Sequence, residues 1–561
     1  MISVGSPQTY IRTGAAAPRI FDLCHLLIAF NFPPRWRGMF IERKDLYGLL
    51  DLNRSDVLIS APHEEKESSV EVSKDLRAFP ASARVIADYW IRVLLVSALI
   101  LIPCVWHRHI EAGDLGSHVY NAWLAQLIEH GQAPGLRIAY PSTNILFDSL
   151  LSGLAKIFGF QIAERLSVAI AVLIFFWGAF ALVAAASKRA PWLLTPLIAM
   201  AAYGWTFEIG FFNYYIALGL SFFALAIFWR GTVREWAIAI ALIPLIYVAH
   251  PLGVIWLIAA ASYIRVASFI PPRFQIFLVA AAAGIVFLLH LYLSHHFVVG
   301  AAFDPLQMFN GGDQLVLFGD RYKIVEALCG IFVAVAIAAD VIARRRERNF
   351  WHAYLVPLEL YVIAEIAVFL LPDGVRVPNQ PAALALITER LTSISAVLIC
   401  CVLGAMLPRK WHLVALAGIA AVFFTFLYQD TAMINRMEAE VATLLKTLPP
   451  DQRVLATILK PDESRVLVQH IVDRECIGRC FSYGNYEPAS GVFRIQALPG
   501  NKYAMTDFED VASMEGGEYK MLPEDLPAYQ IYQCDEDWTE LCIRPLAAGE
   551  LNDRLGVHPE D

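Results

Sequence analysis

Charged side chains are scarce in this sequence. Only 17% of its 561 residues are Asp, Glu, Lys or Arg, against about 25% in an average soluble domain, and 57% are hydrophobic. Because long apolar stretches recur as well, the composition indicates a polytopic membrane protein rather than a soluble one. We therefore expect membrane lipids as partners and no nucleic acid.

Several familiar motifs are missing too. No Gly-rich phosphate loop or nucleotide fold is apparent, which disfavours nucleotide-sugar enzymes and ATP-driven pumps. No internal repeat is found, whereas a transporter built from two related halves would show one. The first 88 residues lack the basic start and the small-residue cleavage site of a signal peptide. Since Glu64–Lys74 is charged and Ser-rich, we predict a partly disordered cytoplasmic extension over 1–88.

The net charge of −8 is concentrated in the C-terminal region. From Met437 onward there are 23 acidic and 11 basic residues, whereas the remainder holds 29 acidic and 33 basic ones. This part of the sequence alternates short strand-like and helix-like segments, so we predict a small soluble α+β domain over 429–561. The segments are strands at Arg453–Leu459, Ser464–Val472, Tyr529–Tyr532 and Leu541–Ile543, and a helix at Glu438–Leu445.

Four of the nine cysteines lie in the same polar region: Cys476, Cys480, Cys534 and Cys542. An even set in one polar domain suits disulfide bonds in an oxidising compartment. Zinc fits less well, because the C-x3-C and C-x7-C spacings do not match the usual pairs.

Apolar length predicts about eleven membrane-spanning helices within residues 89–428. They are Tyr89–Trp106, Ile162–Ser187, Pro191–Phe207, Ile209–Trp229, Trp236–Ala249, Leu252–Ala267, Phe274–Leu293, Lys323–Ala343, Ala353–Leu371, Arg390–Leu407 and Trp411–Tyr428. Basic residues such as Arg344-Arg345-Arg346 occupy one set of alternate loops, and acids such as Asp114 occupy the other. The positive-inside rule then places the N-terminus in the cytoplasm and the C-terminal domain in the periplasm of a bacterial-type inner membrane.

The first predicted outer loop, 107–160, is unusually long. It contains Asp114, His118 and two amphipathic segments, Val119–Ile128 and Ile145–Phe158. Ala122, Trp123, Gln126 and Leu127 give the first segment a half-apolar face suited to a bilayer surface. The simplest role of Asp114 is to cap the following helix, since Asp is a favoured N-cap residue. A carboxylate and an imidazole at the membrane surface also suit chemistry on a lipid-linked substrate.

The layout of this region resembles the GT-C superfamily, integral membrane glycosyltransferases that use polyprenyl-phosphate sugars. The resemblance covers 89–428 in layout and is sharp over about the first hundred of those residues. Its elements are Asp114, Val119–His130, Gly131-Gln132-Ala133-Pro134, Tyr140-Pro141, Ile145–Phe158 and Ala163-Glu164-Arg165. The chain departs from many members by having Asp114-Leu115 instead of an Asp-Glu pair, and Tyr-Pro-Ser instead of consecutive prolines.

The resemblance implies an inverting hexosyl or pentosyl transfer from a polyprenyl-phosphate donor to a glycan, lipid or protein acceptor. Asp114 would be the general base that accepts the proton of the acceptor hydroxyl. His118, one helical turn further on, would face the same cavity. The phosphate leaving group needs a cation or a metal. Mg²⁺ or Mn²⁺ are the metals to consider, with Asp114 and Glu208 as candidate ligands.

Five further residues are candidates for substrate binding, and each has a simpler alternative. Glu208 resembles a second, metal-linked acid of some GT-C enzymes, but it also suits an interface among aromatic anchors. Asn213 is a weaker candidate in the same segment, and His250 could simply bond a carbonyl freed by the following proline. Arg390 could hold a lipid phosphate through two parallel hydrogen bonds, or pair with a neighbouring acid. Arg376 is a looser version of the same idea.

Two other function classes remain open at this point. A lipid-linked sugar transporter or flippase predicts charged or broken helices at the bilayer midplane, in two related halves. A non-catalytic assembly protein that works through its periplasmic tail predicts that Asp114 is dispensable.

Overall fold

The computed structural model describes residues 81–300, 309–347, 350–378, 384–458, 464–466, 468, 470–534 and 540–552. All of them belong to one compact unit, Arg54–Asp561. The predicted extension over 1–88 falls outside the described residues up to position 80. Helix α4 (Ala81–Ile100) begins eight residues before the predicted start at Tyr89, because apolar length alone does not detect a polar first turn.

The protein is mainly helical, and seven of its described helices are long and apolar enough to cross a membrane. The seven are α7 (Phe160–Ser187), α10 (Phe212–Arg230), α14 (Gln275–His296), α15 (Tyr322–Arg344), α16 (Phe350–Leu370), α17 (Ile387–Gly404) and α18 (Lys410–Leu445). These helices make the chain a membrane protein. The predicted count of about eleven spans is not confirmed.

The remaining predicted spans are shorter or broken. The segment predicted as Pro191–Phe207 consists of η2 (Trp192–Leu194), α8 (Thr195–Ala202) and α9 (Trp205–Glu208), separated at the extended residue Gly204. The segment predicted as Trp236–Ala249 is divided into α11 (Val233–Ala241) and α12 (Ile243–Ala249), with a proline in the first turn of α12. Proline has no backbone N–H and interrupts a helical hydrogen-bond ladder, so apolar length alone overestimates such spans. Helix α13 (Pro251–Ala267) has 17 residues.

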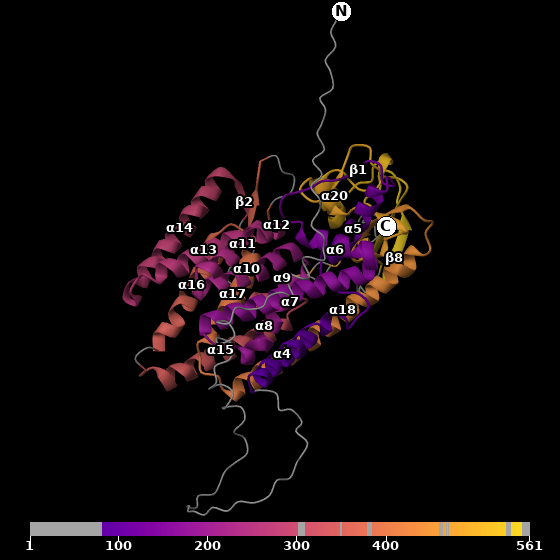
Figure 1. The fold of residues 1–561 in the computed structure, drawn as a ribbon. Coiled ribbons are helices and arrows are strands. Elements are labelled where there is room, and N and C mark those ends of the chain that lie inside the picture. Colours follow the sequence, from indigo (N-terminus) through magenta and orange to yellow (C-terminus); the bar gives the residue numbers. More distant parts are fainter. Residues whose placement is uncertain are drawn as a thin grey trace, which may run out of the picture. The chain divides into compact units, whose positions relative to one another are not determined.

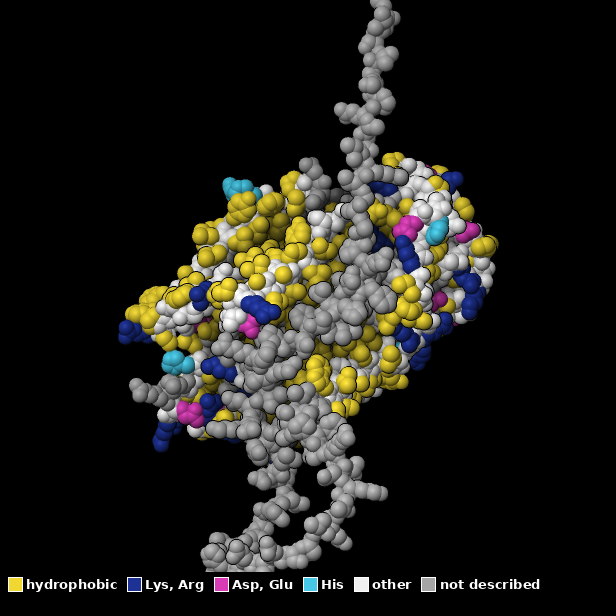
Figure 2. Space-filling model, in the orientation of Figure 1, with side chains coloured by type: hydrophobic (Ala, Val, Ile, Leu, Met, Phe, Trp, Pro, Cys, Tyr) yellow, Lys and Arg dark blue, Asp and Glu magenta, His cyan; other side chains and the backbone are white. Residues whose placement is uncertain are grey.

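The long helices differ in how far the rest of the chain covers them. Helices α7 and α10 pack along one another and are largely buried, with the rings of Phe175 and Tyr215 stacked at 4.4 Å between centroids. Helix α14, by contrast, exposes large apolar side chains such as Ile276, Phe277 and Ile285. On the face drawn in Figure 2, hydrophobic side chains form a broad band across the helical region. An apolar surface of this kind is expected where lipid, not water, is the solvent.

Three elements occupy the long loop between α4 and α7: α5 (Leu115–Glu129), β1 (Leu136–Ile138) and α6 (Leu146–Phe158). The helices predicted over Val119–Ile128 and Ile145–Phe158 are confirmed. Two further short strands, β2 (Val298–Gly300) and β3 (Gly374–Arg376), pair antiparallel between later helices. Short 3-10 helices complete the described elements outside the C-terminal region: η1 (Ile102–Cys104), η3 (Pro272–Phe274) and η4 (Phe309–Leu315).

The region after α18 combines strands and short helices, as predicted. Its sheet has the order β5-β4-β7-β8, in which β4 is parallel to β5 and β7, and β7 is antiparallel to β8. The strands are β4 (Gln452–Thr457), β5 (Cys480–Ser482), β6 (Ile495–Ala497), β7 (Ala528–Gln533) and β8 (Leu541–Pro545). The helices are α19 (Ile471–Glu475), α20 (Tyr486–Ser490), α21 (Phe508–Gly516) and η5 (Pro523–Asp525).

Most local predictions for this region are confirmed, and one is wrong. The strand expected over Ser464–Val472 is absent from the part of that segment that the structure describes, and α19 begins within it at Ile471. The helix expected over Glu438–Leu445 is the end of α18, which runs unbroken across the predicted boundary at residue 429. The four predicted cysteines form two disulfide bonds, Cys476–Cys480 and Cys534–Cys542.

Helix α5 packs against the C-terminal region instead of lying on a bilayer surface. Its Tyr120 and Leu124 are fully buried in one core with residues of α18, β4 and β7. Trp123, on the face predicted to contact lipid, stacks on Phe481 of β5 with 5.7 Å between ring centroids. The interfacial interpretation of this helix is therefore corrected, because the C-terminal region covers its apolar face. Strand β1 also pairs antiparallel with β6, so the loop and the C-terminal region share a sheet as well as a core (Figure 1).

Candidate functional site

Asp114 lies at the start of α5, but its side chain does not cap the helix. It occupies the N-cap position and makes no side-chain capping hydrogen bond. Its backbone N–H instead donates to the carbonyl of Ile209, at 3.1 Å, in the turn before α10. Gly210 permits this contact, since it has a φ of 91° and a side-chain carbon there would lie 2.5 Å from the Asp114 nitrogen. The turn therefore fixes the backbone and leaves the carboxylate free for other partners.

Two side chains of the C-terminal region contact the Asp114 carboxylate, one through an ion pair and the other through a hydrogen bond. His470 Nε2 lies 3.5 Å from Oδ1, and the Tyr486 hydroxyl donates to Oδ2 at 3.3 Å. Gly116 brings α5 against the backbone of His470, because a side-chain carbon at Gly116 would lie 2.0 Å from the His470 carbonyl oxygen. The carboxylate predicted from the first loop thus meets an imidazole that the sequence analysis did not single out.

His470 also lies beside a second carboxylate. Its Nδ1 is 3.0 Å from Oδ2 of Asp473, and that carboxylate accepts further hydrogen bonds from the Ser482 hydroxyl and from Asn485 Nδ2. Burial alone would lower the pKa of His470, but the hydrogen bond to Asp473 and the charges of Asp473 and Asp114 raise it to about 9. At neutral pH an imidazolium therefore lies between two carboxylates.

A small cavity opens beside this group. Its volume is about 130 Å³, and Asp114, His470 and Tyr486 form one side. The other side comes from α21, through Phe508, Val511, Ala512 and Glu515. The cavity therefore combines two acids, a histidine and the rings of Tyr486 and Phe508, and it lies between the first loop and the C-terminal region. A polar ring compound with hydroxyl groups would find both hydrogen-bond partners and apolar faces here.

His118 does not pair with Asp114 as its spacing suggested. Its Nδ1 lies 2.7 Å from Asp148 on α6, and Asn213 donates to the other Asp148 oxygen at 2.8 Å. Burial would lower the pKa of His118, but Asp148 raises it to about 9, with a smaller contribution from Asp114. Asn213 also accepts from the backbone N–H of Phe147 at 2.7 Å. Asn213 thus fixes the first turn of α6, which places Asp148 against His118.

Arg390, near the start of α17, has two donors without a partner. Its Nε and Nη1 are buried, and neither has a hydrogen-bond acceptor among the described residues. The guanidinium lies 4.2 Å from the centroid of the Phe211 ring, which directly follows the turn that holds Asp114. It is also close enough to Asp114 for an electrostatic interaction. Buried N–H groups are almost always satisfied, so this guanidinium is suited to an incoming anion.

The other predicted residues lie apart from this group. Glu208 is buried at the end of α9, its Oε2 has no partner in the described structure, and burial together with the charge of Asp430 raises its pKa. His250 caps α13 by accepting a hydrogen bond from the backbone N–H of Leu252 at 3.2 Å, a local role that differs from the predicted bond to a carbonyl. Arg376 is exposed at the end of β3. The carboxyl group of Glu208 thus feels the charge of Asp430 on α18, and no hydrogen bond or ion pair joins it to Asp114 among the described residues.

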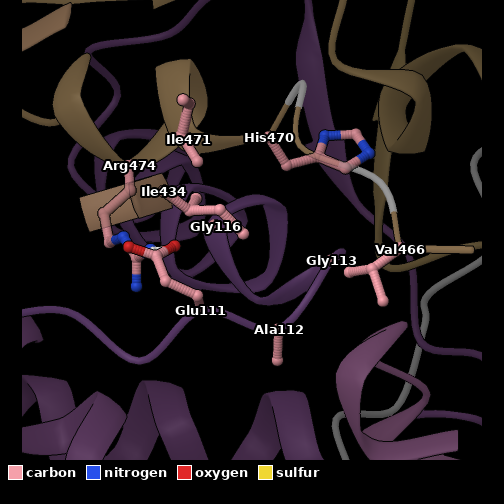
Figure 3. Close-up of a pocket in the computed structure, with 9 residues that line it drawn as sticks. All are labelled: Glu111, Ala112, Gly113, Gly116, Ile434, Val466, His470, Ile471 and Arg474. Atoms are coloured by element: carbon pink, nitrogen blue, oxygen red, sulfur yellow. Dashed lines mark hydrogen bonds and ion pairs between the residues drawn. The ribbon is translucent and has the colours of Figure 1, made fainter. Parts of the chain in front are cut away.

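A second buried cluster of charged side chains lies near the group formed by Asp114 and His470. Arg474 of α19 forms ion pairs with Glu111, Glu164 and Glu438, at 3.3, 2.6 and 2.7 Å. Figure 3 shows the side chains of Arg474 and Glu111 pointing toward each other, with the His470 ring on the other side of Gly116. Because the three acids belong to the first loop, α7 and α18, this guanidinium joins the C-terminal region to the helical part.

The sequence analysis missed the partners from the C-terminal region and from α6. His470 and Asp473 are three residues apart, a helical spacing, but the segment was predicted as a strand and this signal was not used. Tyr486 was not among the candidate site residues, and Asp148 was not considered as a partner for His118, although it lies in a predicted amphipathic helix. No protein-family model, curated protein or solved structure matches this chain. Fold and site together define a mainly helical membrane protein with a carboxylate–imidazolium pocket.

Proposed function

We propose that this protein is a membrane glycosyltransferase that moves a sugar from a polyprenyl-phosphate donor to an acceptor hydroxyl, with Asp114 as general base. The observation that carries the proposal is the position of the Asp114 carboxylate. It does not cap its helix, it lines a small cavity, and it lies near the Arg390 guanidinium, two of whose buried donors have no acceptor among the described residues. The transfer needs those two functions, one to receive a proton and the other to receive a phosphate.

Asp114 is suited to the role of base. The side chain lines the cavity, is 15% exposed and makes no capping hydrogen bond to α5. A carboxylate is a weak base, which suffices if the transition state has strong oxocarbenium character, because the acceptor hydroxyl becomes acidic as it approaches the positive anomeric carbon. His470 is then the positioning group that holds the carboxylate in place.

Arg390 is suited to the phosphate of the donor. Its two buried N–H donors, Nε and Nη1, could each donate a hydrogen bond to the phosphate. A buried cation also stabilises the negative charge that gathers on the departing phosphate. Its position at the end of a long apolar helix suits a phosphate carried on a membrane lipid.

The metal predicted at Asp114 and Glu208 does not fit the described side chains. The carboxyl group of Glu208 is buried, whereas that of Asp114 contacts His470 and Tyr486. Among the described residues, the cluster that could hold a metal includes neither of the two. We therefore derive no step through a metal at this site and assign the phosphate charge to Arg390.

The compartment is part of the proposal. Two disulfide bonds in the C-terminal region suit an oxidising space outside the cytoplasm. The alternation of basic and acidic loops in the sequence supports the same side for Asp114. The reaction would then take place at the outer face of a bacterial-type inner membrane.

The deciding experiment is Asp114→Asn in proteoliposomes supplied with radiolabelled polyprenyl-phosphate sugars and a panel of glycan, lipid and peptide acceptors. Transfer should fall ~10²- to 10⁴-fold, the usual range for loss of a general base. Asp320→Asn is the matched control, since Asp320 is an exposed loop acid that pairs with Lys323. Transfer by Asp114→Asn at the wild-type rate would show that the base is another group.

A second candidate function is favoured by one observation. Both partners of the Asp114 carboxylate come from the C-terminal region, so the contact could serve only to hold the two parts together in a non-catalytic assembly protein. In that case Asp114→Asn lowers the apparent melting temperature, and transfer is absent from the wild type as well. Loss of transfer at an unchanged melting temperature supports the enzyme.

A further inference from the structure

A second set of metal-type ligands lies at the junction of the helical part and the C-terminal region, next to the Arg474 cluster. It consists of His109 in the loop after η1, Glu438 near the end of α18 and Glu475 at the end of α19. One ligand atom from each side chain lies within 4.8 Å of the other two. Three segments that are distant in the sequence thus place one imidazole and two carboxylates around a common point.

The distances leave room for an ion. Nδ1 of His109 lies 4.0 Å from Oε1 of Glu438, and Nε2 lies 3.5 Å from Oε1 of Glu475, both too far for good hydrogen bonds. Only one of the two nitrogens would bind the ion. Ligand atoms that share one Zn²⁺ at ~2.0–2.2 Å are about 3.3 Å apart in tetrahedral geometry. An inward movement of about 1 Å by these side chains, within the reach of small torsion changes, would complete such a shell.

Supporting hydrogen bonds hold two of the three ligands in position. The backbone N–H of His109 donates to Asn435 Oδ1 at 3.0 Å, and Asn435 Nδ2 donates back to the His109 carbonyl at 3.1 Å. Arg474 holds both oxygens of Glu438, through Nε at 2.7 Å and Nη2 at 3.0 Å. Ligating carboxylates commonly carry hydrogen bonds of this kind, which orient them and leave their remaining lone pairs for the metal.

The local charge favours a cation in spite of Arg474. That guanidinium is shared by Glu111, Glu164 and Glu438, all of them buried, and Glu475 adds a fourth acid nearby. Arg108, Lys446 and Arg479 also act on Glu475, and of these Arg108 and Lys446 are solvent-exposed, where water screens them. Buried carboxylates in excess over buried cations are costly, and a divalent ion beside them offsets that cost.

We propose that His109, Glu438 and Glu475 bind one divalent transition-metal ion, Zn²⁺ by preference, with water as the fourth ligand. One imidazole nitrogen and two carboxylate oxygens are a donor set that Zn²⁺ accepts. The ion would tie the loop before Asp114, α18 and α19 together, and so fix the C-terminal region on the helical part. The site is independent of the glycosyltransferase proposal, since it excludes Asp114 and Arg390.

The test uses the full chain, purified without a histidine tag, in nanodiscs. Metal content is measured by mass spectrometry before and after treatment with EDTA, and after incubation with ZnCl₂ or MgCl₂. We expect close to one zinc per chain, a drop of several degrees in apparent melting temperature on removal, and recovery with Zn²⁺ but not with Mg²⁺. His109→Ala and Glu475→Gln should abolish zinc binding.

Two control variants match the test in residue type. His130→Ala removes an exposed histidine whose ring contacts only its own helix, and Glu129→Gln removes an exposed acid paired with Lys156. Both should keep the wild-type zinc content. If wild-type protein takes up no zinc, or if Glu475→Gln retains one zinc per chain, the proposal is wrong. X-ray absorption on the wild type provides a check that needs no variant: oxygen and nitrogen ligands with one imidazole are expected, and sulfur would overturn the assignment.

Discussion

Two histidine–aspartate pairs flank the start of α5, and they differ in the number of carboxylates that each imidazole contacts. His118 is held by Asp148, whose other oxygen is taken by Asn213. His470 is shared between Asp473 and Asp114, and Asp114 lines an open cavity. Both histidines have a pKa of about 9. The comparison teaches that a raised pKa does not by itself mark a catalytic group. The first pair is satisfied internally, whereas the second still faces an empty space.

The largest expected difference between the pairs is in activity. His470→Gln removes the cation that holds the Asp114 carboxylate beside the cavity. We expect transfer to fall ~10²- to 10³-fold at pH 7, and the variant to lose the change in rate that accompanies deprotonation of His470, whose pKa is about 9. His118→Gln should lower the rate less than ~10-fold with an unchanged pH profile. Rate–pH profiles of both variants, measured with the same donor, decide the point. Equal losses in the two variants would mean that His470 has no role in transfer that His118 lacks.

The next effect is on stability. Asp148→Asn removes the main group that raises the pKa of His118, and the loss of the shift from 6.5 to about 9 corresponds to about 3 kcal/mol at pH 6. Asp473→Asn should cost about half as much, because Asp114 remains as a second acid beside His470. Steric-trapping measurements of unfolding free energy in bicelles would compare the two. A larger cost for Asp473→Asn would mean that Asp114 contributes little to His470.

A third effect is the pH dependence of stability. Both histidines have a folded-state pKa raised from 6.5 to about 9. Their stabilisation is therefore fully present below pH 6.5 and is lost as the pH rises through 9. The apparent melting temperature of the wild type should fall steadily between pH 6.5 and 9.5. In His118→Gln and in His470→Gln the slope should be about half as steep, and a slope unchanged in either would exclude that histidine as the titrating group.

The smallest effect concerns the hydroxyl of Tyr486. Tyr486→Phe removes one hydrogen bond to Asp114, of 3.3 Å, and keeps the ring beside His470 and Phe493. A net loss of about 1 kcal/mol in transition-state stabilisation is expected, which is about fivefold in kcat/KM. Tyr503→Phe is the control, since the Tyr503 hydroxyl donates a hydrogen bond to the backbone carbonyl of Gln132, an exposed residue. A loss above a hundredfold would give Tyr486 a direct role in the chemistry.

Much of the local structure could be predicted from the sequence. Amphipathic spacing predicted α5 and α6, and the even set of polar cysteines predicted the disulfide bonds. The number of spans could not be predicted, because a proline in the first turn of α12 and the extended Gly204 interrupt apolar segments that hydropathy counts as whole. Apolar content also could not tell lipid from protein as the cover of α5. That face is buried by residues more than three hundred positions away.

The site itself could be predicted only in part. Asp114 and Arg390 stood out because each is a charged group at the end of an apolar segment. His470, Asp473 and Tyr486 join Asp114 only through tertiary contacts, for which a single sequence holds no periodic signal. His118 illustrates the opposite error. Helical spacing predicted that it would pair with Asp114, but its ring forms an ion pair with Asp148 of α6 instead.

The pairing of β1 with β6 has a consequence for biogenesis. Arg137 and Gln496, which meet in this pairing, are 359 residues apart. The ribosome therefore releases the loop that carries Asp114 long before it makes the strand and the histidine that complete the pocket. A nascent chain that has already inserted all its apolar helices still has an incomplete pocket at Asp114. Synthesis order thus delays the assembly of this pocket until His470 and β6 have been made and have packed against that loop.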